Sequence, residues 1–464
     1  MPRVSRDKDG LAEARAAVSI RPQFAALAPG WLWTLLVIVM IGAGGTSIAY
    51  PMMRTLSGLC GAMALAAAVT SRSSRWTRPG PADWIVAGMV MLFLVQLIPL
   101  PPAIWTRLPG HELIAAIDRE VFGQPLWRSL SIDSEATWQS FAFLIPFLGA
   151  YLAYRSGSTQ RRAALMRGVA IGFAIAIAMG LLQAAGLDAL HPYPIEADNQ
   201  YGNGFFTNHN HQATFVLMAG LLLACHPAMP DKGLLDARVM GLALAAGLAT
   251  LVSGSRAGFA LLMLTALAFG AAWFVTRERP AGSVASSRRP LILALGGSGI
   301  LAAAIAALVI SADRFALGRG ALLDDPRFEI IPVAWQAIWQ FWPFGSGFGT
   351  FQTPYWQVEP IEALRILDIN HAHNDLIEAA IEGGAFALAL ILALILRIAV
   401  LTGRALRTKG PQAMRTAATG LALLVPLVHS LVDYPLRAMA VAVLFAIALA
   451  KLEAETSETF ESKA

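Results

Sequence analysis

The amino-acid sequence predicts an all-α polytopic membrane protein with about twelve transmembrane helices. Of its 464 residues, 56% are hydrophobic and only 14% are charged, whereas a soluble domain carries roughly a quarter charged residues. The apolar residues gather in runs long enough to cross a hydrocarbon core about 30 Å thick. The abundance of Leu, Ala and Gly fits helices that pack closely inside a membrane.

Apolar runs separated by polar or helix-breaking residues define the expected spans. Flanking them, the sequence predicts a cytoplasmic N-terminal segment at 1–30, a transmembrane domain at 31–452 and a cytoplasmic tail at 453–464. The expected helices are 31–49, 53–70, 83–100, 137–154, 165–186, 212–228, 238–254, 257–275, 290–311, 375–401, 413–432 and 436–452.

Basic residues gather in alternate loops, and this determines the predicted orientation. Loops rich in Lys and Arg face the cytoplasm in membrane proteins. The loops that contain Arg72, Arg155, Arg277 and Arg404 are therefore expected inside. The lysines fall on the same side, namely Lys8, Lys232, Lys409, Lys451 and Lys463. Both termini are predicted to be cytoplasmic.

Three longer segments then lie on the opposite side, at about 101–136, 187–211 and 312–374. The third is rich in aromatic residues. Its stretch from Pro332 to Gln340 places apolar and Trp side chains at helical spacing. This pattern predicts an amphipathic helix at the outer interface, where Trp favours the headgroup zone.

One polar cluster stands at the predicted outer start of the span 375–401. Ionisable groups at membrane depth are costly and usually face a cavity, so the cluster is a candidate functional site. From a helix start near Asn374, Glu378 and Glu382 follow on one face. The alternative is a capped helix end with solvated histidines. The cluster comprises His371, His373, Asn374, Asp375, Glu378 and Glu382.

Two arginines on the predicted outer side are candidates for binding phosphate, because a guanidinium can donate two parallel hydrogen bonds to phosphate oxygens. Arg256 stands in the turn Ser253–Gly258 between two spans. Arg327 follows Asp324 and Asp325 at the start of the amphipathic stretch. The alternatives are that Arg256 reaches into the interface and that Arg327 pairs with Asp325.

Further histidines stand near the same side. His209 and His211 precede the span 212–228 and are candidates for binding a sugar hydroxyl or a phosphate; the alternative is an interfacial cap. His429 and Asp433 are interpreted as a structural histidine–carboxylate pair, because they lie one turn apart.

Neither a metal nor a cofactor is expected. The sequence contains no HExxH motif, and the HxH pattern with scattered acids is not that of a metalloprotease helix. Cys60 and Cys225 both lie in apolar runs, which does not indicate a disulfide framework or a metal cluster. The basic residues stand in short loops, so no nucleic-acid partner is expected.

Over about 200–440, the chain resembles the bacterial O-antigen ligase and polymerase superfamily. The matching residues are Ser255–Gly258, Arg327, Trp335, Pro343–Phe351, and His371–Asn374 with Glu378 and Glu382. In the ligases of this family, a Gly and a nearby hydroxyl residue follow the His motif. Here His373, Asn374 and Gly384 match, but Ala387 stands where the hydroxyl is expected.

The resemblance implies a helical bundle similar to the C-type glycosyltransferases, in the bacterial inner membrane, with a long periplasmic loop at 312–374. It implies metal-independent, inverting transfer of a glycan from an undecaprenyl-diphosphate carrier, with lipid A–core as the first expectation for the acceptor. Arg256 and Arg327 would bind the diphosphate, and His373 would act as general base, oriented by Glu382 or Glu378. The remaining substrate-binding candidates are His371, Asn374, His209 and His211.

Three alternatives stay open. A polymerase would transfer to a growing O-antigen or exopolysaccharide chain. A transporter or flippase would place ionisable residues near the bilayer midplane or show repeated halves, and the sequence shows neither pattern. A non-catalytic scaffold would tolerate alanine at Arg256 and His373. The glycosyltransferase hypothesis requires those two residues to share one pocket.

Overall fold

The computed structural model describes residues 30–46, 50–71, 74, 76, 78–193, 201–226, 236–278, 326–364 and 369–461. These residues form helices and connecting loops, with one short antiparallel hairpin of β1 (Pro99–Leu100) and β2 (Arg128–Ser129). Five of the helices are long and apolar enough to cross a membrane. The predicted class, an all-α membrane protein, is confirmed at this level.

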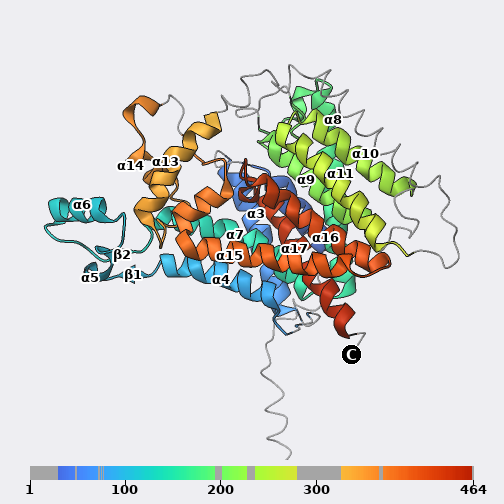
Figure 1. Cartoon of the computed structure of the whole chain (residues 1–464), viewed down its shortest axis with the longest axis horizontal. Coiled ribbons are helices and arrows are strands. Elements are labelled where there is room, and N and C mark those ends of the chain that lie inside the picture. The colour runs from blue at the N-terminus through green and yellow to red at the C-terminus, as the bar shows by residue number, and fades with distance from the viewer. Residues whose placement is uncertain are drawn as a thin grey trace, which may run out of the picture.

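Eleven of the expected spans correspond to helices within a few residues, and the expected span 290–311 lies outside the described residues (Figure 1). The helices are α2 (Gly30–Ala43), α3 (Pro51–Thr70), α4 (Pro81–Gln96), α7 (Ser134–Arg155), α8 (Thr159–Ala184), α9 (His209–Ala224), α10 (Ala237–Val252), α11 (Arg256–Thr276), α15 (Asp375–Leu406), α16 (Pro411–His429) and α17 (Met439–Glu461).

The segments expected as long loops contain shorter helices. They are α5 (Pro102–Trp105), α6 (Glu112–Phe122), η2 (Asp188–Leu190), α13 (Pro326–Phe341), α14 (Gln352–Val358) and η4 (Ile361–Ala363). A further short helix, η5 (Pro435–Arg437), occupies the expected start of the span 436–452, and α17 begins after it at Met439. Helix α13 includes the stretch predicted to be amphipathic. Val333 and Ala337 are buried in it, whereas Trp335 and Trp339 are exposed.

The core of the bundle lies around α17, which packs against α7, α2, α16 and α9. Its side chains from Ala440 to Leu452 are almost all buried. Small residues let the helices approach closely. A Cβ atom at Gly44 would lie 2.7 Å from the backbone nitrogen of Ala440, and one at Gly61 would lie 2.5 Å from the Cα atom of Pro146.

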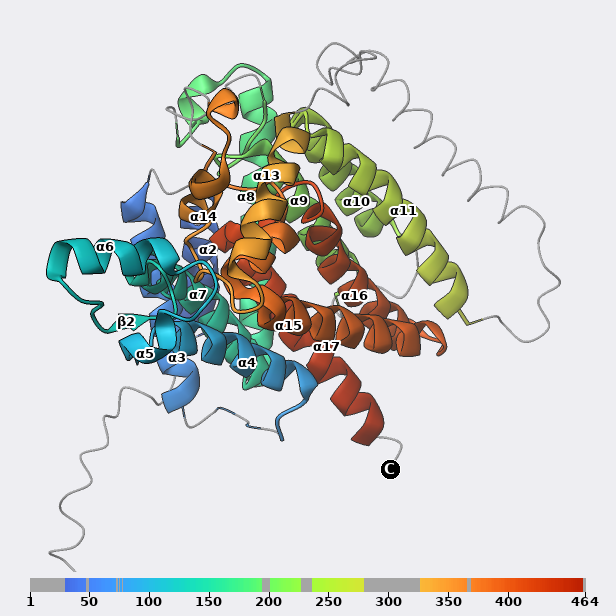
Figure 2. The ribbon, with the colours of Figure 1, turned by 60° about the vertical axis from the view of Figure 1, so that its left-hand side comes forward.

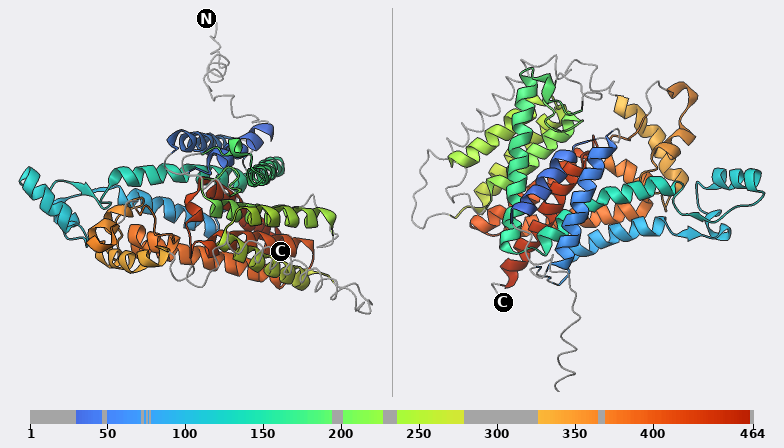
Figure 3. Two further views of the ribbon diagram at one scale, coloured as in Figure 1. Left: turned by 90° about the horizontal axis from the view of Figure 1, so that it is seen from above. Right: turned by 180° about the vertical axis from the view of Figure 1, so that it is seen from behind.

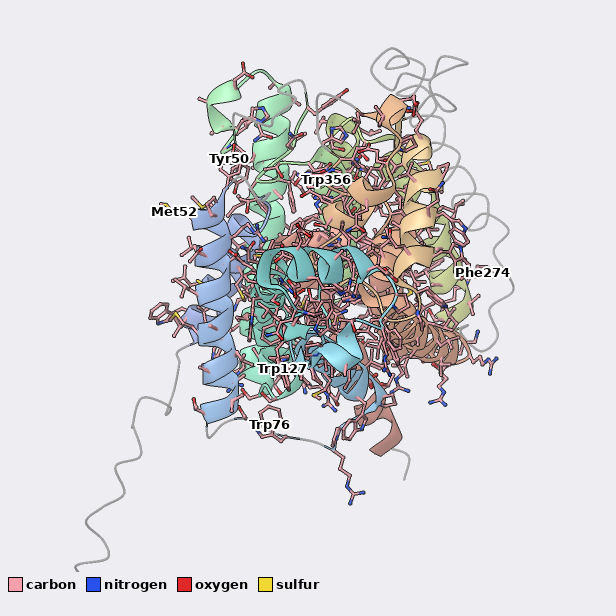
Figure 4. All side chains as sticks on the ribbon, turned by 90° about the vertical axis from the view of Figure 1, so that its left-hand side faces the viewer. Tyr50, Met52, Trp76, Trp127, Phe274 and Trp356 are labelled. Carbon is pink, nitrogen blue, oxygen red and sulfur yellow. The ribbon has the colours of Figure 1, made fainter. Side chains whose placement is uncertain are left out.

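The bundle has two chemically different ends. Figure 3 shows, in the view from behind, that α17 finishes at one end of the bundle. Toward that end, an ion pair joins Arg397 to Glu453 at 2.7 Å, and another joins Arg155 to Asp83 at 3.1 Å. The opposite end carries the starts of α9, α11 and α15. Figure 4 shows Tyr50, which precedes α3, near one end and Trp76, which follows α3, near the other. Arg155 and Arg78, which belong to two of the loops predicted as cytoplasmic, lie together near the end of Trp76, since Arg155 donates to the carbonyl of Arg78 at 3.3 Å.

Candidate functional site

Polar residues from five segments converge at the end opposite to the basic loops. They come from the start of α9, the turn before α11, the start of α15, the end of α16 and η5. Helix α13 packs against α15 beside this end (Figure 2). The sequence-predicted cluster 371–382 thus meets the predicted turn of Arg256 and the 208–211 motif.

Asn374 begins α15 and fixes its first turn. Its side-chain Oδ1 accepts hydrogen bonds from the backbone N–H groups of Leu376 at 2.9 Å and Ile377 at 3.1 Å. Its Nδ2 donates to the carbonyl of Leu431 at 2.9 Å. This confirms the predicted N-cap. His373, just before the cap, has a φ of 50°, a left-handed conformation that is uncommon for a residue with a side chain.

The imidazole of His373 faces a carboxylate from the other side of the site. Its Nδ1 lies 3.5 Å from Oδ1 of Asp433, which is fully buried. Asn210 donates through Nδ2 to Oδ2 of Asp433 at 2.6 Å and accepts through Oδ1 from Oγ of Ser255 at 2.6 Å. Ser255 caps α11 immediately before Arg256. Hydrogen bonds therefore lead from the turn of Arg256 through Asn210 to Asp433, and the final step to His373 is a 3.5 Å approach, since Nδ1 of His373 has no hydrogen-bond partner among the described residues.

One expected pairing differs from the structure. Glu378 and Glu382 were expected to orient His373, but Glu378 contacts His371, with 2.8 Å between Nδ1 and Oε1. The reason is geometric: the carboxylates follow the face of α15, whereas His373 precedes the helix and lies against the segment after α16.

His429, which was expected to pair with Asp433, contacts a hydroxyl group on α9. Its Nδ1 lies 2.5 Å from the hydroxyl of Thr214, and both side chains are buried. The carboxylate of Asp433 contacts Asn210 and His373, which makes it part of the site.

Arg437 of η5 lies among the carboxylates of α15 and was missed by the sequence analysis. Its Nη2 donates to Oε2 of Glu382 at 2.8 Å. Its Nε lies 3.4 Å from Oε1 of Glu378 and 3.5 Å from Oδ1 of Asp375. Burial opposes the charge, but the three carboxylates raise the pKa of Arg437 above its ordinary value, so the guanidinium stays charged. The one available signal was an arginine at the outer start of the expected span 436–452.

Tyr434, also missed, lies among three imidazoles. The centroid of its ring is 4.2 Å from that of His371, 5.1 Å from that of His373 and 5.2 Å from that of His211. His211 is buried, and its Nε2 has no hydrogen-bond partner among the described residues. Such an atom is costly unless a ligand or water satisfies it, so the aromatic and imidazole groups line a candidate binding surface.

His209 lies at the edge of this group, against Tyr201, with 4.8 Å between ring centroids. A Cβ atom at Gly254 would meet the same Tyr201 ring at 2.3 Å. His209 thus lies beside the turn of Arg256 and not among the imidazoles at Tyr434.

A break in α15 determines where Glu382 points. Gly384 has φ 59° and ψ −149°, a conformation almost restricted to glycine. The loop Pro343–Phe351 fills the break. The backbone N–H of Ala385 donates to the carbonyl of Pro343 at 2.9 Å, and a Cβ atom at Gly384 would lie 2.1 Å from that carbonyl oxygen.

The same loop satisfies the carbonyl groups that the break releases. The N–H of Ser346 donates to the carbonyl of Ile381 at 2.9 Å, and the N–H of Gly347 donates to that of Glu382 at 2.9 Å. The N–H of Phe351 also donates to the Glu382 carboxylate at 3.3 Å. The glycine-rich motif therefore supports Glu382 structurally.

The position of Arg327 is known only through its backbone, which lies in the first turn of α13. Its side chain, and Asp324 and Asp325, lie outside the described part of the chain. Among the side chains that the structure describes, no group of three or more His, Cys, Asp or Glu residues has the arrangement of a metal site.

Comparison with known proteins gives one match. Residues 241–392 match the family model described as O-antigen ligase. The matched range includes the turn of Arg256, the loop Pro343–Phe351 and the start of α15, whereas Asn210, Asp433 and Arg437 lie outside it but contact it. No curated protein matches the chain.

Proposed function

The chain belongs to the O-antigen ligase superfamily, and on this basis we propose that it transfers a glycan from an undecaprenyl-diphosphate carrier to an acceptor at the periplasmic face of the inner membrane. Family membership and apolar helices make it a multi-pass, ligase- or polymerase-like membrane enzyme. In this proposal all twelve expected spans cross the membrane, both termini are cytoplasmic, and 312–374 forms a periplasmic loop.

The observation that carries the proposal is the chain of contacts from His373 through Asp433 and Asn210 to Ser255. It supports the proposal because it links the turn Ser253–Gly258 to the motif His371–Asn374, two of the motifs on which the resemblance rests. Glycan transfer needs a base for the acceptor hydroxyl and positive charge for the departing diphosphate. The site offers an imidazole and an arginine for these two tasks.

His373 is the proposed general base. Its Nε2 takes the proton of the acceptor hydroxyl while that oxygen bonds to the anomeric carbon. The bond from this carbon to the diphosphate oxygen breaks, and attack from the opposite side inverts the anomeric centre. Asp433 beside Nδ1 favours the tautomer with its proton on Nδ1, which leaves Nε2 free to accept.

Arg256 and Arg327 are the proposed ligands of the donor diphosphate. Arg256 is the first residue of α11, where the dipole of the helix adds partial positive charge. Two arginines would neutralise the leaving group without a metal ion. His371, Asn374, Glu378, His209 and His211 are proposed to contact the sugars. Glu382 is reassigned from orienting His373 to shaping the pocket wall.

O-antigen ligation to lipid A–core is the first proposed reaction, and chain polymerisation is the second. Ala387, where ligases of the family carry a hydroxyl residue, favours neither decisively. Deleting the gene separates the two reactions. Lipid-linked polymer above unmodified core identifies a ligase, whereas core carrying single repeat units identifies a polymerase.

A reconstituted transfer assay tests the mechanism. We expect His373→Ala and Arg256→Ala to insert and fold but to lose transfer, because a base or a diphosphate ligand is removed. The matched control is His226→Ala, a histidine near the opposite end of α9, which should keep wild-type transfer. Added chelator should leave the rate unchanged. Normal transfer by His373→Ala would remove the histidine from the mechanism, and strong inhibition by the chelator would require a metal.

A further inference from the structure

The segment from Ser430 to Arg437 is attached to α15 at both of its ends. At the first end, Ser430 donates through Oγ to Asp375 Oδ2 at 2.6 Å, and the N–H of Asp375 donates to the Ser430 carbonyl at 3.0 Å. Asn374 donates to the carbonyl of Leu431 at 2.9 Å. At the second end, Arg437 binds the carboxylates of α15. The segment therefore crosses the start of α15 between two fixed points.

The two residues that contact the histidines lie between these points. Asp433 lies 3.5 Å from Nδ1 of His373, and the ring of Tyr434 stacks near His371. Neither residue belongs to a long helix, because α16 ends at His429 and η5 begins at Pro435. Asp433 has contacts of its own, since it accepts from Asn210 at 2.6 Å and its backbone N–H donates to the carbonyl of His429 at 3.0 Å. The attachments at either side, including the charged Arg437, add to these contacts.

Electrostatics makes the second attachment strong. Asp375, Glu378 and Glu382 stand on one face of α15, three and four residues apart, and like charges at these spacings repel. The side chains of Glu378 and Glu382 are 0% and 1% exposed, so water screens them little. Arg437 supplies the opposite charge from η5. Removing it would leave buried carboxylates without their counter-ion, a strongly destabilising change.

We infer that Arg437 is a positioning residue, which by binding the carboxylate face of α15 holds Asp433 against His373. The inference rests on the proposed function of His373. It assigns Arg437 no contact with the donor diphosphate, since three protein carboxylates already surround its guanidinium.

The test compares Arg437→Gln and Arg437→Lys with a matched control. We expect Arg437→Gln to lower kcat by about 10- to 100-fold with little change in the KM for the donor, because a catalytic pair displaced by about 1 Å loses activity on that scale. Arg437→Lys should keep an intermediate kcat, since an ammonium preserves the charge but not the fork geometry. The control Arg397→Gln also removes a guanidinium, one that lies on α15 and pairs with Glu453 of α17. It should leave kcat unchanged.

Nitrogen-15 NMR of histidine in the reconstituted protein supplies a readout independent of turnover. The wild type should show His373 protonated on Nδ1, and Arg437→Gln should show His373 in mixed tautomers. The His373 signal is assigned as the one that disappears from the spectrum of His373→Gln. A raised donor KM with unchanged kcat and tautomer would make Arg437 a substrate ligand and overturn the inference. A wild-type kcat and tautomer in Arg437→Gln would overturn it too. Transfer by His373→Ala would instead contradict the proposed function.

Discussion

The backbone at His373 is held in an unusual conformation just outside a helix. A φ of 50° turns the imidazole away from the face of α15 that carries Glu378 and Glu382, and toward the segment after α16. Left-handed backbone in a residue with a side chain costs on the order of 1–3 kcal/mol and persists where surrounding contacts enforce it. The Asn374 cap and its bond to Leu431 provide that enforcement.

The pairing of His373 with Asp433 makes a prediction for Asp433→Asn. The amide keeps the size of the side chain but loses the charge that stabilises a protonated imidazole. We expect kcat to fall by about 10²- to 10⁴-fold, the range over which acid–base catalysis and correct tautomers contribute. In a transfer assay, His373→Ala combined with Asp433→Asn should be no slower than His373→Ala alone, since the two act as one unit.

A matched control for that variant is Asp83→Asn, which neutralises a carboxylate bonded to Arg155 at the opposite end of the bundle. It should keep the wild-type kcat. If Asp433→Asn also kept the wild-type rate, Asp433 would have no part in catalysis.

At this scale, sequence reasoning identified the residue types but not their partners. His371, His373, Glu378 and Glu382 were found because ionisable groups near membrane depth are conspicuous. Their pairings were missed because they depend on a residue about 60 positions further along the chain. Nothing in a linear pattern indicates that the segment after α16 returns to the start of α15.

At the scale of the secondary-structure elements, the break in α15 determines the geometry of the site. A continuous helix would bond the carbonyls of Ile381 and Glu382 internally, whereas the break exposes them to the N–H groups of Ser346 and Gly347. A long helix interrupted inside a membrane protein is tolerated where other protein groups satisfy the freed backbone. The loop Pro343–Phe351 fulfils this condition, which explains its density of glycines.

The break predicts a severe effect for Gly384→Ala. The added Cβ would lie 2.1 Å from the carbonyl oxygen of Pro343, in a backbone conformation nearly closed to alanine. We expect a free energy of unfolding lower by more than about 2 kcal/mol, from strain of roughly 1–3 kcal/mol plus the clash. Thermal unfolding in detergent measures it.

The control for the glycine variant lies on the same helix. A Cβ atom at Gly403 would meet nothing within 4 Å beyond the backbone of its own helix, and Gly403 has an ordinary helical conformation. Gly403→Ala should be neutral or stabilising by about 1 kcal/mol, because alanine favours a helix over glycine. Equal melting temperatures for the two variants would mean that the break does not require glycine.

Helices were predictable from the sequence, but the break was not. Hydropathy indicates that 375–401 is apolar enough to span a membrane, and the pattern continues through Gly383 and Gly384 without interruption. Glycines occur in many unbroken membrane helices. The break depends on the insertion of a loop about 40 residues earlier, which is a tertiary event. The starts of α15 and α11 were predicted within one residue, because Asn374 and Ser255 are caps that act locally.

At the scale of the whole molecule, the distribution of charge separates the two ends of the bundle. Arg78 and Arg155, which alternate loops assign to one side, lie together at one end, where Arg155 pairs with Asp83. The site residues meet at the other end. Hydropathy and charge are enough to predict which end of each span carries basic residues, because both act on every span. The order in which the helices pack depends on particular residues such as Gly44 and Gly61.

This separation predicts which end faces the periplasm. The test uses a chain in which Cys60 and Cys225 are changed to serine. One variant carries a new cysteine at Glu120 on α6, near the site end, and the other carries it at Thr408 after α15, at the basic end. Both chosen positions are exposed, whereas Cys60 is buried and Cys225 half-buried. Because basic loops stay in the cytoplasm, a membrane-impermeant maleimide added to spheroplasts should label Glu120→Cys and spare Thr408→Cys until the cells are lysed. Labelling in the reverse order would place the site in the cytoplasm, where nucleotide sugars and not flipped lipid-linked glycans are the available donors.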